Sequence, residues 1–502
     1  MAMAKTIGEL RRSGYKVRSV KDEVRNNVIH KLQNKEPLFP GIIGYDQTVI
    51  PSLINAILAR HDILLLGLRG QAKSRIVRML PSLLDEHIPF IKGCEINDNP
   101  YRPVCKHCTD LVAERGEETE IAWLHRDRRF GEKLATPDVT IADLIGDIDP
   151  IKAAGQRLHY SHEGAIHFGI IPRTNRGIFA INELPDLQPR IQVGLFNIME
   201  EKDIQIRGFN VRIPLDVMIV FTANPEDYTN RGNLITPLKD RIDSQIVTHY
   251  PKTIEDAIRI TEQEAWLQRD GLEVIIPTYF KEIVEQAAFE ARKSEFVDQK
   301  SGVSARLTIT TMENLVSNAE RRAILLGERS VVPRIIDLQH ALPGMTGKVE
   351  LVFEGEQEGP AKVSKALIGK AVKEIFKRYF PDPLQRRPRQ QEGETRQQEG
   401  SEYGKIVGWF EAGNTIEIAD EMPLKEYFGV LDRVKGLREF TRKHLKIGES
   451  DTYELASAME FVLDGLHQSS RIAKEELDHG ISYRDLVGSI FTGRGKGIEE
   501  ED

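Results

Sequence analysis

The chain has 502 residues, of which 40% are hydrophobic and 29% charged, a composition that excludes wholesale disorder and a length that predicts about three domains. The net charge of −8 gives no global basic field for nucleic acid. No apolar run approaches the ~20 residues of a membrane span, and the charged N-terminus lacks a signal core, so we expect a cytoplasmic protein. Three cysteines exclude a disulfide framework.

The first half of the chain alternates short apolar runs with helical stretches. The segments DILLLG (62–67), RGIFAINE (176–183) and VMIVFTANP (217–225) are apolar on both faces, which is typical of buried central strands in an α/β sheet. Ahead of them, residues 5–35 are charged and sparsely apolar and predict one or two surface helices. The expected domains are an N-terminal helical extension over 1–36 and an α/β domain over 37–250.

The second half has helical periodicity, as in the segments 280–294 and 308–326. The segment 385–402 contains no hydrophobic residue and predicts a disordered linker. Beyond it we expect helices, the longest over 453–477, and a disordered tail over 493–502. The expected regions are a helical region over 251–384, the linker over 385–402 and a separate helical domain over 403–502.

A phosphate-binding pattern follows the first of these strands. GLRGQAKS (67–74) is G-x-x-x-x-G-K-[ST] with Ala72 in place of the last glycine, which is tolerable if this position keeps a negative φ. Backbone N–H groups of such a loop wrap phosphates, Lys73 would reach the β- and γ-phosphates, and Ser74 would ligate Mg²⁺. The candidate nucleotide-binding residues here are Gly67, Arg69, Gly70, Gln71, Ala72, Lys73, Ser74 and Arg75.

A second acidic element ends the strand at 176–183. Glu183 is placed to polarise an attacking water, and the position before it, where a carboxylate is usual, is Asn182. The Asn182 carbonyl oxygen would hold a Mg²⁺-bound water without a carboxylate's attraction. We therefore expect slow hydrolysis, or a metal held mainly by Ser74 and the phosphates. The alternative is a buried strand that merely ends in a polar turn.

Three further polar residues follow in order. Asn224 ends the strand at 217–225 and is placed to orient the lytic water, and Arg241 comes 17 residues later. Arg306 lies at the start of a predicted helix that Ser304 would cap. Isolated arginines are usually solvated surface residues. The order of the motifs is what makes these arginines candidates for catalysis.

This order resembles that of AAA+ ATPases of the magnesium-chelatase small subunit and MoxR type. RGIFAINELPDL resembles the chelatase Walker B stretch apart from Asn182, FTANPEDY its sensor 1, PLKDRID its arginine-finger segment, and GVSAR its sensor 2 region. The segment 39–58, with Ile43 and Gly44, resembles the part that packs on adenine. The resemblance covers about residues 39–345.

The resemblance implies a P-loop AAA+ parallel sheet flanked by helices, an all-α lid, and an ATP hydrolase that uses ATP and Mg²⁺. It also implies a homo-oligomeric ring, a hexamer, in which Arg241 acts in trans, and a partner with a von Willebrand A domain. Two family insertions, at 159–177 and 201–217, would line the ring pore or face the partner. In the second, apolar residues alternate around Gly208 and predict a β-hairpin, for which an ordinary surface hairpin is the alternative reading.

The cysteines lie in GCEINDNPYRPVCKHC. Cys105 and Cys108 form a C-x₂-C pair that supplies two zinc ligands, Cys94 would be a third, and His107 or His125 a fourth. Only one clear ligand pair is evident, so structural cysteines are favoured over zinc or a thiol switch.

Four functions remain open: a ring motor that remodels a partner, a transcription activator, a nucleic-acid motor, and a weakly hydrolysing ATP-binding scaffold. An activator of the enhancer-binding class would carry G-A-F-T-G-A and a basic helix-turn-helix, and we identify neither in the sequence. The net charge of −8 disfavours nucleic acid, although Arg207 and Arg212 on the predicted hairpin keep that reading open. Asn182 favours the scaffold. If Arg241 is not a finger, we expect it to pair with Asp240 or Asp243.

Overall fold

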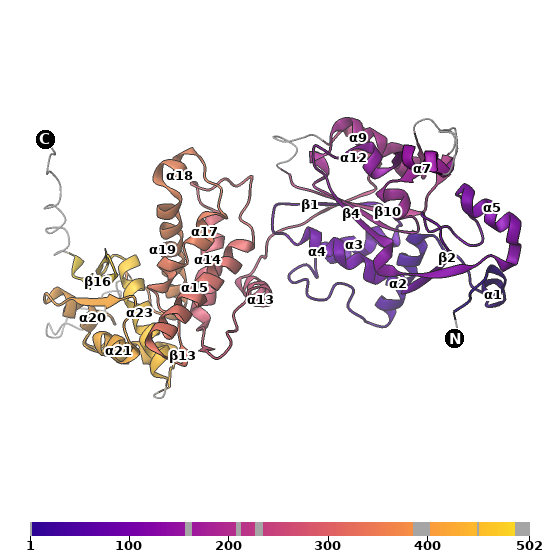
Figure 1. The fold of residues 1–502 in the computed structure, drawn as a ribbon. Helices are drawn as coiled ribbons and strands as arrows, with labels where there is room; N and C mark the ends of the chain where they lie inside the picture. The colour runs from indigo at the N-terminus through magenta and orange to yellow at the C-terminus, as the bar shows by residue number, and fades with distance from the viewer. Residues whose placement is uncertain are drawn as a thin grey trace, which may run out of the picture. The chain divides into compact units, whose positions relative to one another are not determined.

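The computed structural model describes residues 3–155, 163–206, 212–225, 234–384, 402–448 and 451–486. The chain forms two compact units, Met1–Tyr250 and Pro251–Asp502, each described here by itself (Figure 1). No helix in the described ranges has the length and apolarity that crossing a membrane requires.

The first unit is built on a five-stranded sheet in the order β11-β1-β10-β7-β4, with every neighbouring pair parallel. β7 and β10 are buried at every residue, which confirms the prediction of central strands. Because all strands are parallel, their carboxyl ends lie at one edge. The strands are β1 (Ile63–Leu66), β4 (Phe130–Leu134), β7 (Gly177–Asn182), β10 (Val217–Ala223) and β11 (Ser244–Val247).

Helices cover both faces of this sheet (Figure 1). Alternate residues of β1 point to opposite faces, so Ile63 and Leu65 join one core and Leu64 the other. The first core contains α2 (Val20–Gln33), α3 (Val49–Leu58) and α4 (Lys73–Met79). The second contains α9 (Pro189–Gly194), α10 (Phe196–Glu200) and α12 (Thr236–Arg241).

The N-terminal segment differs from the prediction of surface helices. It forms α1 (Ile7–Arg12) and α2, and α2 buries Val20, Val24 and Val28 against the sheet. Valines at i, i+4 and i+8 share one helix face, which is why α2 packs inward. The helix also buries Glu23 in an ion pair with Arg129 at 2.7 Å.

The first unit also contains small antiparallel pairs of strands. The predicted hairpin is present as β8 (Asp203–Gln205) and β9 (Arg212–Pro214), in which the buried Ile204 and Ile213 lie opposite each other. Its turn, with Arg207, Gly208 and Val211, lies outside the described residues, as does the start of the 159–177 insertion. The other elements of this unit are β2 (His87–Ile91), α5 (Lys106–Arg115), β3 (Ile121–His125), α6 (Ile141–Leu144), β5 (Gly146–Ile148), α7 (Pro150–Gly155), β6 (Ile166–Phe168) and α8 (Ile170–Arg173).

The second unit is mainly helical and also contains a three-stranded antiparallel sheet in the order β14-β16-β15. Its helices are α13 (Ile254–Glu264), α14 (Thr278–Ala291), α15 (Arg306–Leu326), α16 (Asp337–His340), α17 (Pro343–Thr346), α18 (Phe353–Glu358), α19 (Pro360–Tyr379), α20 (Gly404–Glu411), α21 (Leu424–Asp432), α22 (Leu437–Leu445) and α23 (Thr452–Gln468). Its strands are β12 (Glu273–Val274), β13 (Ser330–Val331), β14 (Ile416–Ala419), β15 (Ala473–Leu477) and β16 (Gly480–Arg484).

The C-terminal region corrects two expectations. The helix expected over 453–477 ends at Gln468, because Ser470 takes a left-handed conformation and the chain then pairs as β15 with β16. The region is also not separate from 251–384. Glu460 on α23 accepts hydrogen bonds from the backbone N–H groups of Ile335 and Ile336 at 3.1 and 3.0 Å, and one hydrophobic core spans both regions. The common hydrophobic core therefore joins the predicted regions 251–384 and 403–502 into one unit.

Candidate functional site

Three of the predicted residues follow adjacent strands of the central sheet. Lys73 follows β1 through the loop 67–72, Asn224 directly follows β10, and Glu183 directly follows β7. The strands lie in the order β1-β10-β7, and Leu66 is in register with Ala223. The parallel sheet therefore brings a cation, an amide and a carboxylate to one edge.

The side chains of these three residues are in contact. The Lys73 ammonium donates to Asn224 Oδ1 at 2.6 Å, to the Leu68 carbonyl at 3.0 Å, and to the Gly67 carbonyl. Asn224 Nδ2 in turn donates to Glu183 Oε2 at 2.6 Å. The Asn224 amide thus links the lysine to the carboxylate. Glu183 also has φ +54°, a left-handed backbone of the kind that clusters at functional sites.

The glycine-rich loop is anchored by residues that the sequence analysis missed. Tyr45 donates its hydroxyl to the Gln71 carbonyl at 3.0 Å, and Thr248 donates to the Gln71 side chain at 2.7 Å. Tyr250 donates to the Arg69 carbonyl at 2.9 Å. Burial raises the pKa of Tyr45 to about 12, so its hydroxyl stays protonated and can donate. Tyr45 directly follows Ile43 and Gly44, which places the predicted adenine-side segment beside the loop.

The backbone of the loop corrects the expectation for Ala72. Its φ is +55°, in the left-handed region, so the condition of a negative φ under which alanine is tolerated without strain is not met. The cost of this conformation for a residue with a Cβ is roughly 1–2 kcal/mol. Gly70 has φ +72°, and a Cβ on Gly67 would lie 2.0 Å from the Thr248 hydroxyl oxygen. The loop therefore needs glycine at 67 and strains alanine at 72.

A second carboxylate lies beside Asn182. Asn182 Nδ2 donates to Glu132 Oε1 at 2.6 Å, and its carbonyl oxygen accepts from the Thr222 hydroxyl at 3.2 Å. Glu132 also forms an ion pair with Arg78 at 3.1 Å. Arg78 lies one helical turn after Ser74 on α4, so Glu132 faces the side of α4 that carries Ser74.

These groups fit a magnesium ion. Mg²⁺ prefers hard oxygen ligands, and the Ser74 hydroxyl, the Glu132 carboxylate and the Asn182 carbonyl oxygen are ligands of that kind. The sequence analysis missed Glu132, because it lies on β4 and only the pairing of β4 with β7 brings it to Asn182.

The two predicted arginines lie elsewhere. Arg241 pairs with Glu200 at 2.7 Å and stacks over Phe196 at 4.7 Å, so it is held between α12 and α10. The predicted pairing with Asp240 or Asp243 is wrong, because Glu200 takes that place and Asp243 accepts from the Asp62 backbone N–H at 2.8 Å. Arg306 is exposed in the second unit and begins α15 as predicted. The Ser304 hydroxyl accepts from the Arg306 N–H at 3.2 Å, although Ala305 is the N-cap.

The three cysteines are buried and lie together with Asp98. Neither predicted histidine joins them: His107 is exposed on α5, and His125 lies opposite His87 in the β2–β3 pair. Hydrogen bonding from the Cys105 and Cys108 thiols lowers the pKa of Cys94, and burial raises the pKa of Asp98.

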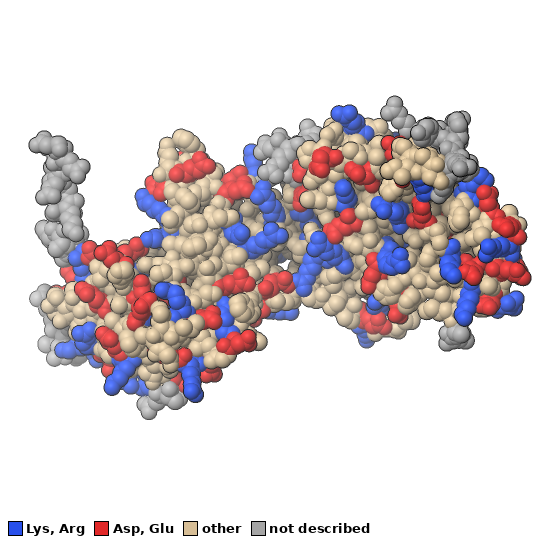
Figure 2. Space-filling view, in the orientation of Figure 1, with Lys and Arg blue, Asp and Glu red and all other residues tan. Residues whose placement is uncertain are grey.

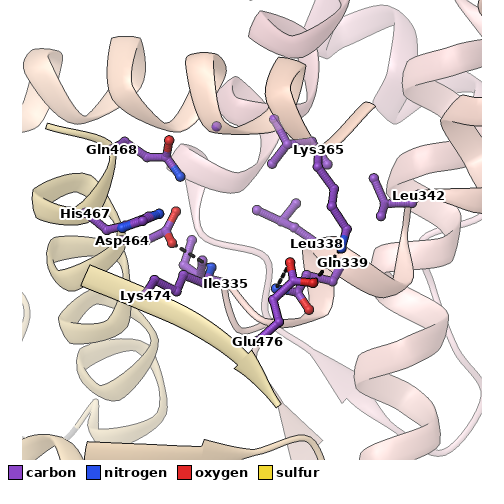
Figure 3. Close-up of a pocket in the computed structure, with 12 residues that line it drawn as sticks. Ile335, Leu338, Gln339, Leu342, Lys365, Asp464, His467, Gln468, Lys474 and Glu476 are labelled. Atoms are coloured by element: carbon purple, nitrogen blue, oxygen red, sulfur yellow. Dashed lines mark hydrogen bonds and ion pairs between the residues drawn. The ribbon is translucent and has the colours of Figure 1, made fainter. Parts of the chain in front are cut away.

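A hollow of about 210 Å³ lies in the second unit, and none of the predicted site residues lines it (Figure 3). Its charged groups are already paired: Lys365 contacts Glu476 at 2.6 Å, and Lys474 contacts Asp464 at 2.7 Å. On the visible face of the molecule, acidic and basic side chains are interspersed over both units (Figure 2). Neither this hollow nor the mixed surface charge indicates a functional site, so the carboxyl edge of the central sheet remains the candidate site.

Two sequence matches to known proteins overlap part of this chain. The model of the sigma-54 interaction domain matches residues 159–246. The archaeal Lon protease of Thermococcus kodakarensis is 27% identical over 208 residues, which are 38% of this chain and 31% of that protein's length.

Matches to solved structures have low sequence identity and low TM-scores. A BchI–BchD magnesium chelatase complex is 19% identical, with 64% of this chain and 98% of that chain covered and a TM-score of 0.33. NtrX from Brucella abortus in complex with ATP is 12% identical, with 58% and 55% covered and a TM-score of 0.33. The domain model, the motif order and the parallel sheet show that the first unit has the P-loop AAA+ ATPase fold.

Proposed function

We propose that this chain binds and hydrolyses ATP, assembles as a homo-oligomeric ring, and uses hydrolysis to remodel a partner protein. The observation that carries the proposal is the contact of Lys73, Asn224 and Glu183 at the carboxyl edge of three adjacent parallel strands. A cation, an orienting amide and a carboxylate are groups that assist in-line attack of water on a γ-phosphate.

Each residue has a distinct part in this mechanism. The backbone of 67–74 wraps the triphosphate, and Lys73 exchanges its carbonyl partners for β- and γ-phosphate oxygens. Asn224 then keeps its hydrogen bond to Glu183 and orients the water, while Glu183 accepts the proton. Ser74 would hold a Mg²⁺ ion, with Glu132 and Asn182 nearby, and the bound ion would neutralise charge on the phosphates.

Ring assembly would explain why the Arg241 side chain is held apart from Lys73, Asn224 and Glu183. Its guanidinium is held on α10 and α12 by Glu200, Phe196 and the Pro237 carbonyl, and Lys73, Asn224 and Glu183 are absent from these contacts. An arginine finger acts on the nucleotide of a neighbouring subunit, so this placement suits a trans role. Arg306 on α15 is proposed to read the nucleotide state as sensor 2. A hexamer is the proposed ring size.

The proposed partner carries a von Willebrand A domain, as in magnesium chelatase and MoxR systems. This proposal rests on the resemblance of the motifs, and the hairpin β8–β9 is the proposed contact. Arg212 on β9 is exposed and pairs with Asp203 at 3.5 Å, so the described strands of the hairpin carry a balanced charge and not a basic surface for nucleic acid.

A transcription activator is the second candidate, since the matching domain model is that of sigma-54 interaction. Against it, the sequence contains no G-A-F-T-G-A segment. The matched residues 159–246 hold the Walker B, hairpin, sensor 1 and arginine-finger elements, which partner-remodelling AAA+ proteins share. A complex of the full chain with sigma-54 in the presence of ATP would favour the activator.

The proposal is tested by calorimetric titration of ATP into the Lys73→Ala variant. Loss of the Lys73 charge should weaken ATP binding about 10- to 100-fold, since hydrogen bonds to charged groups contribute roughly 1.5–3 kcal/mol. Lys92→Ala is the control, because Lys92 is exposed in a surface pair with Glu120. Equal ATP affinity in the two variants would contradict the phosphate-binding assignment.

A further inference from the structure

We propose that Cys94, Asp98, Cys105 and Cys108 form a tetrahedral zinc site. The four residues are buried, and their ligand atoms all lie within 4.8 Å of one another. The site lies in the loop after β2 and the first turn of α5, and it is independent of the proposed ATPase function.

The spacing of the ligand atoms fits a single metal ion. Ligands about 2.3 Å from a tetrahedral zinc lie about 3.8 Å from one another. The sulfur atoms of Cys94 and Cys105 are 4.0 Å apart. A multi-iron cluster would need its sulfur ligands farther apart, because several irons and sulfides lie between them. The spacing of the four ligand atoms therefore fits a single metal ion.

Asp98 supplies the ligand that the sequence analysis could not find. Its Oδ2 atom accepts from the N–H groups of Val104 and Cys105 at 3.0 and 2.9 Å. Its Oδ1 atom is buried without a hydrogen-bond partner, and the whole residue is 0% exposed. A buried carboxylate oxygen needs a partner, and a metal ion among the three sulfurs provides one. Two backbone hydrogen bonds hold the carboxylate in this orientation.

Backbone N–H groups also support the sulfurs as thiolates. The Asp98 N–H donates to Cys94 Sγ at 3.3 Å, and the Cys108 N–H donates to Cys105 Sγ at 3.4 Å. Hydrogen bonds of this kind fix and tune metal ligands from outside the coordination shell. The C-x₂-C pair at the start of α5 therefore has the geometry of a metal-binding turn.

The surroundings balance the charge and provide access. Three thiolates and a carboxylate outweigh one divalent ion, leaving a net negative site. Cys94 lines a hollow of about 530 Å³ that Arg128 and Arg173 also line, together with Lys152 and its ion-pair partner Glu95 at 2.8 Å. Arg128 and Arg173 offset part of the negative charge, and the hollow gives an ion a path to Cys94.

The ligand set selects the metal by softness. Thiolates bind zinc well, whereas magnesium and calcium prefer oxygen ligands. A second group in the described part of the chain, Glu86, His87 and His125, is half-buried or exposed and has no sulfur. It serves as an internal control, since zinc bound there would have no thiolate ligand.

The test is cobalt substitution of the full-length chain, with zinc content measured before exchange. We expect about one zinc per chain and, after exchange with Co²⁺ alone, the near-ultraviolet thiolate-to-cobalt band together with the visible bands of a tetrahedral ion. Cys105→Ser and Cys108→Ser should lose the charge-transfer band in proportion to the sulfur removed. Asp98→Asn should keep that band and bind Co²⁺ about 10- to 100-fold more weakly. His125→Ala should match the parent.

Several outcomes would overturn the proposal. A Co²⁺ spectrum without a thiolate-to-cobalt band would place the ion at the group of Glu86, His87 and His125. Loss of the Co²⁺ bands in the His125→Ala variant would place it there as well. Isolation of the chain with a Cys94–Cys105 disulfide and no retained metal would assign the cluster to a thiol switch. If Cys105→Ser fails to fold, Asp98→Asn alone decides, because it keeps all three sulfurs and changes only the fourth ligand.

Discussion

Ala72 shows how one methyl group changes the phosphate loop. Its left-handed backbone, φ +55°, costs roughly 1–2 kcal/mol with a Cβ and almost nothing with glycine. Glycine also loses about 0.5–1 kcal/mol through the entropy of the unfolded chain. The strain exceeds the entropy term, so the natural alanine is a destabilising choice at this position.

We therefore predict that Ala72→Gly raises the free energy of unfolding by roughly 0.5–1 kcal/mol. Urea denaturation followed by circular dichroism measures this change. Ala59→Gly is the matched control, because Ala59 has φ −82° and should lose stability instead. Equal losses in both variants would show that Ala72 is not strained.

Glu132 is the residue on which the metal argument depends. It accepts a hydrogen bond from Asn182 at 2.6 Å and takes a place near the missing Walker B carboxylate. We predict that Glu132→Gln weakens ATP binding about tenfold in Mg²⁺ and leaves it unchanged in EDTA, since only the charge is removed. Calorimetric titrations in the two buffers measure the difference.

Two variants sharpen this test. Glu86→Gln changes an exposed carboxylate and should show no Mg²⁺-dependent loss. Asn182→Asp places two carboxylates side by side, so it should destabilise the metal-free chain and increase the dependence of ATP affinity on Mg²⁺. Identical Mg²⁺ dependence in the parent and Glu132→Gln would remove Glu132 from the metal site.

At the scale of elements, the sequence predicted those strands and site residues whose pattern lies within one short segment of the chain. β7 and β10 were predictable because central strands are apolar on both faces. Glu183 and Asn224 were predictable because they directly follow these strands, and Lys73 because it ends the glycine-rich loop after β1. β15 was not predictable, since its pairing with β16 overrides a helical pattern. Glu132 and Asp98 were missed for the same reason: strand pairing and a buried loop bring them to their partners.

Helices α10 and α12 set the environment of Arg241. We predict that Arg241→Ala abolishes turnover while ATP affinity stays within about twofold, because a finger supplied in trans acts on the transition state. Glu200→Gln breaks the pair at 2.7 Å and should keep turnover, since it frees the guanidinium. Steady-state phosphate release over a range of protein concentrations measures both variants.

The outcome distinguishes catalysis from structure. If Arg241 only joined the two helices, the two variants would behave alike, and each would lose at most about 1 kcal/mol of stability. A fall in turnover in Glu200→Gln equal to that in Arg241→Ala would therefore contradict the trans role.

For the whole molecule, we propose that residues at the carboxyl edge of one parallel sheet hydrolyse ATP. Both units contribute proposed parts: the first holds Lys73, Asn224, Glu183 and Arg241, and the second holds Arg306. Ring assembly would bring the Arg241 of one subunit to the nucleotide of the next. All of these parts depend on nucleotide being bound and cleaved at Glu183.

The most direct test of that claim is the fate of ATP bound to Glu183→Gln. After incubation with Mg²⁺ and ATP, the retained nucleotide is extracted and separated by chromatography. We predict that the variant retains ATP, while the parent chain releases phosphate and retains ADP, because glutamine cannot accept the proton from water. Hydrolysis by the variant at the parent's rate would contradict the account.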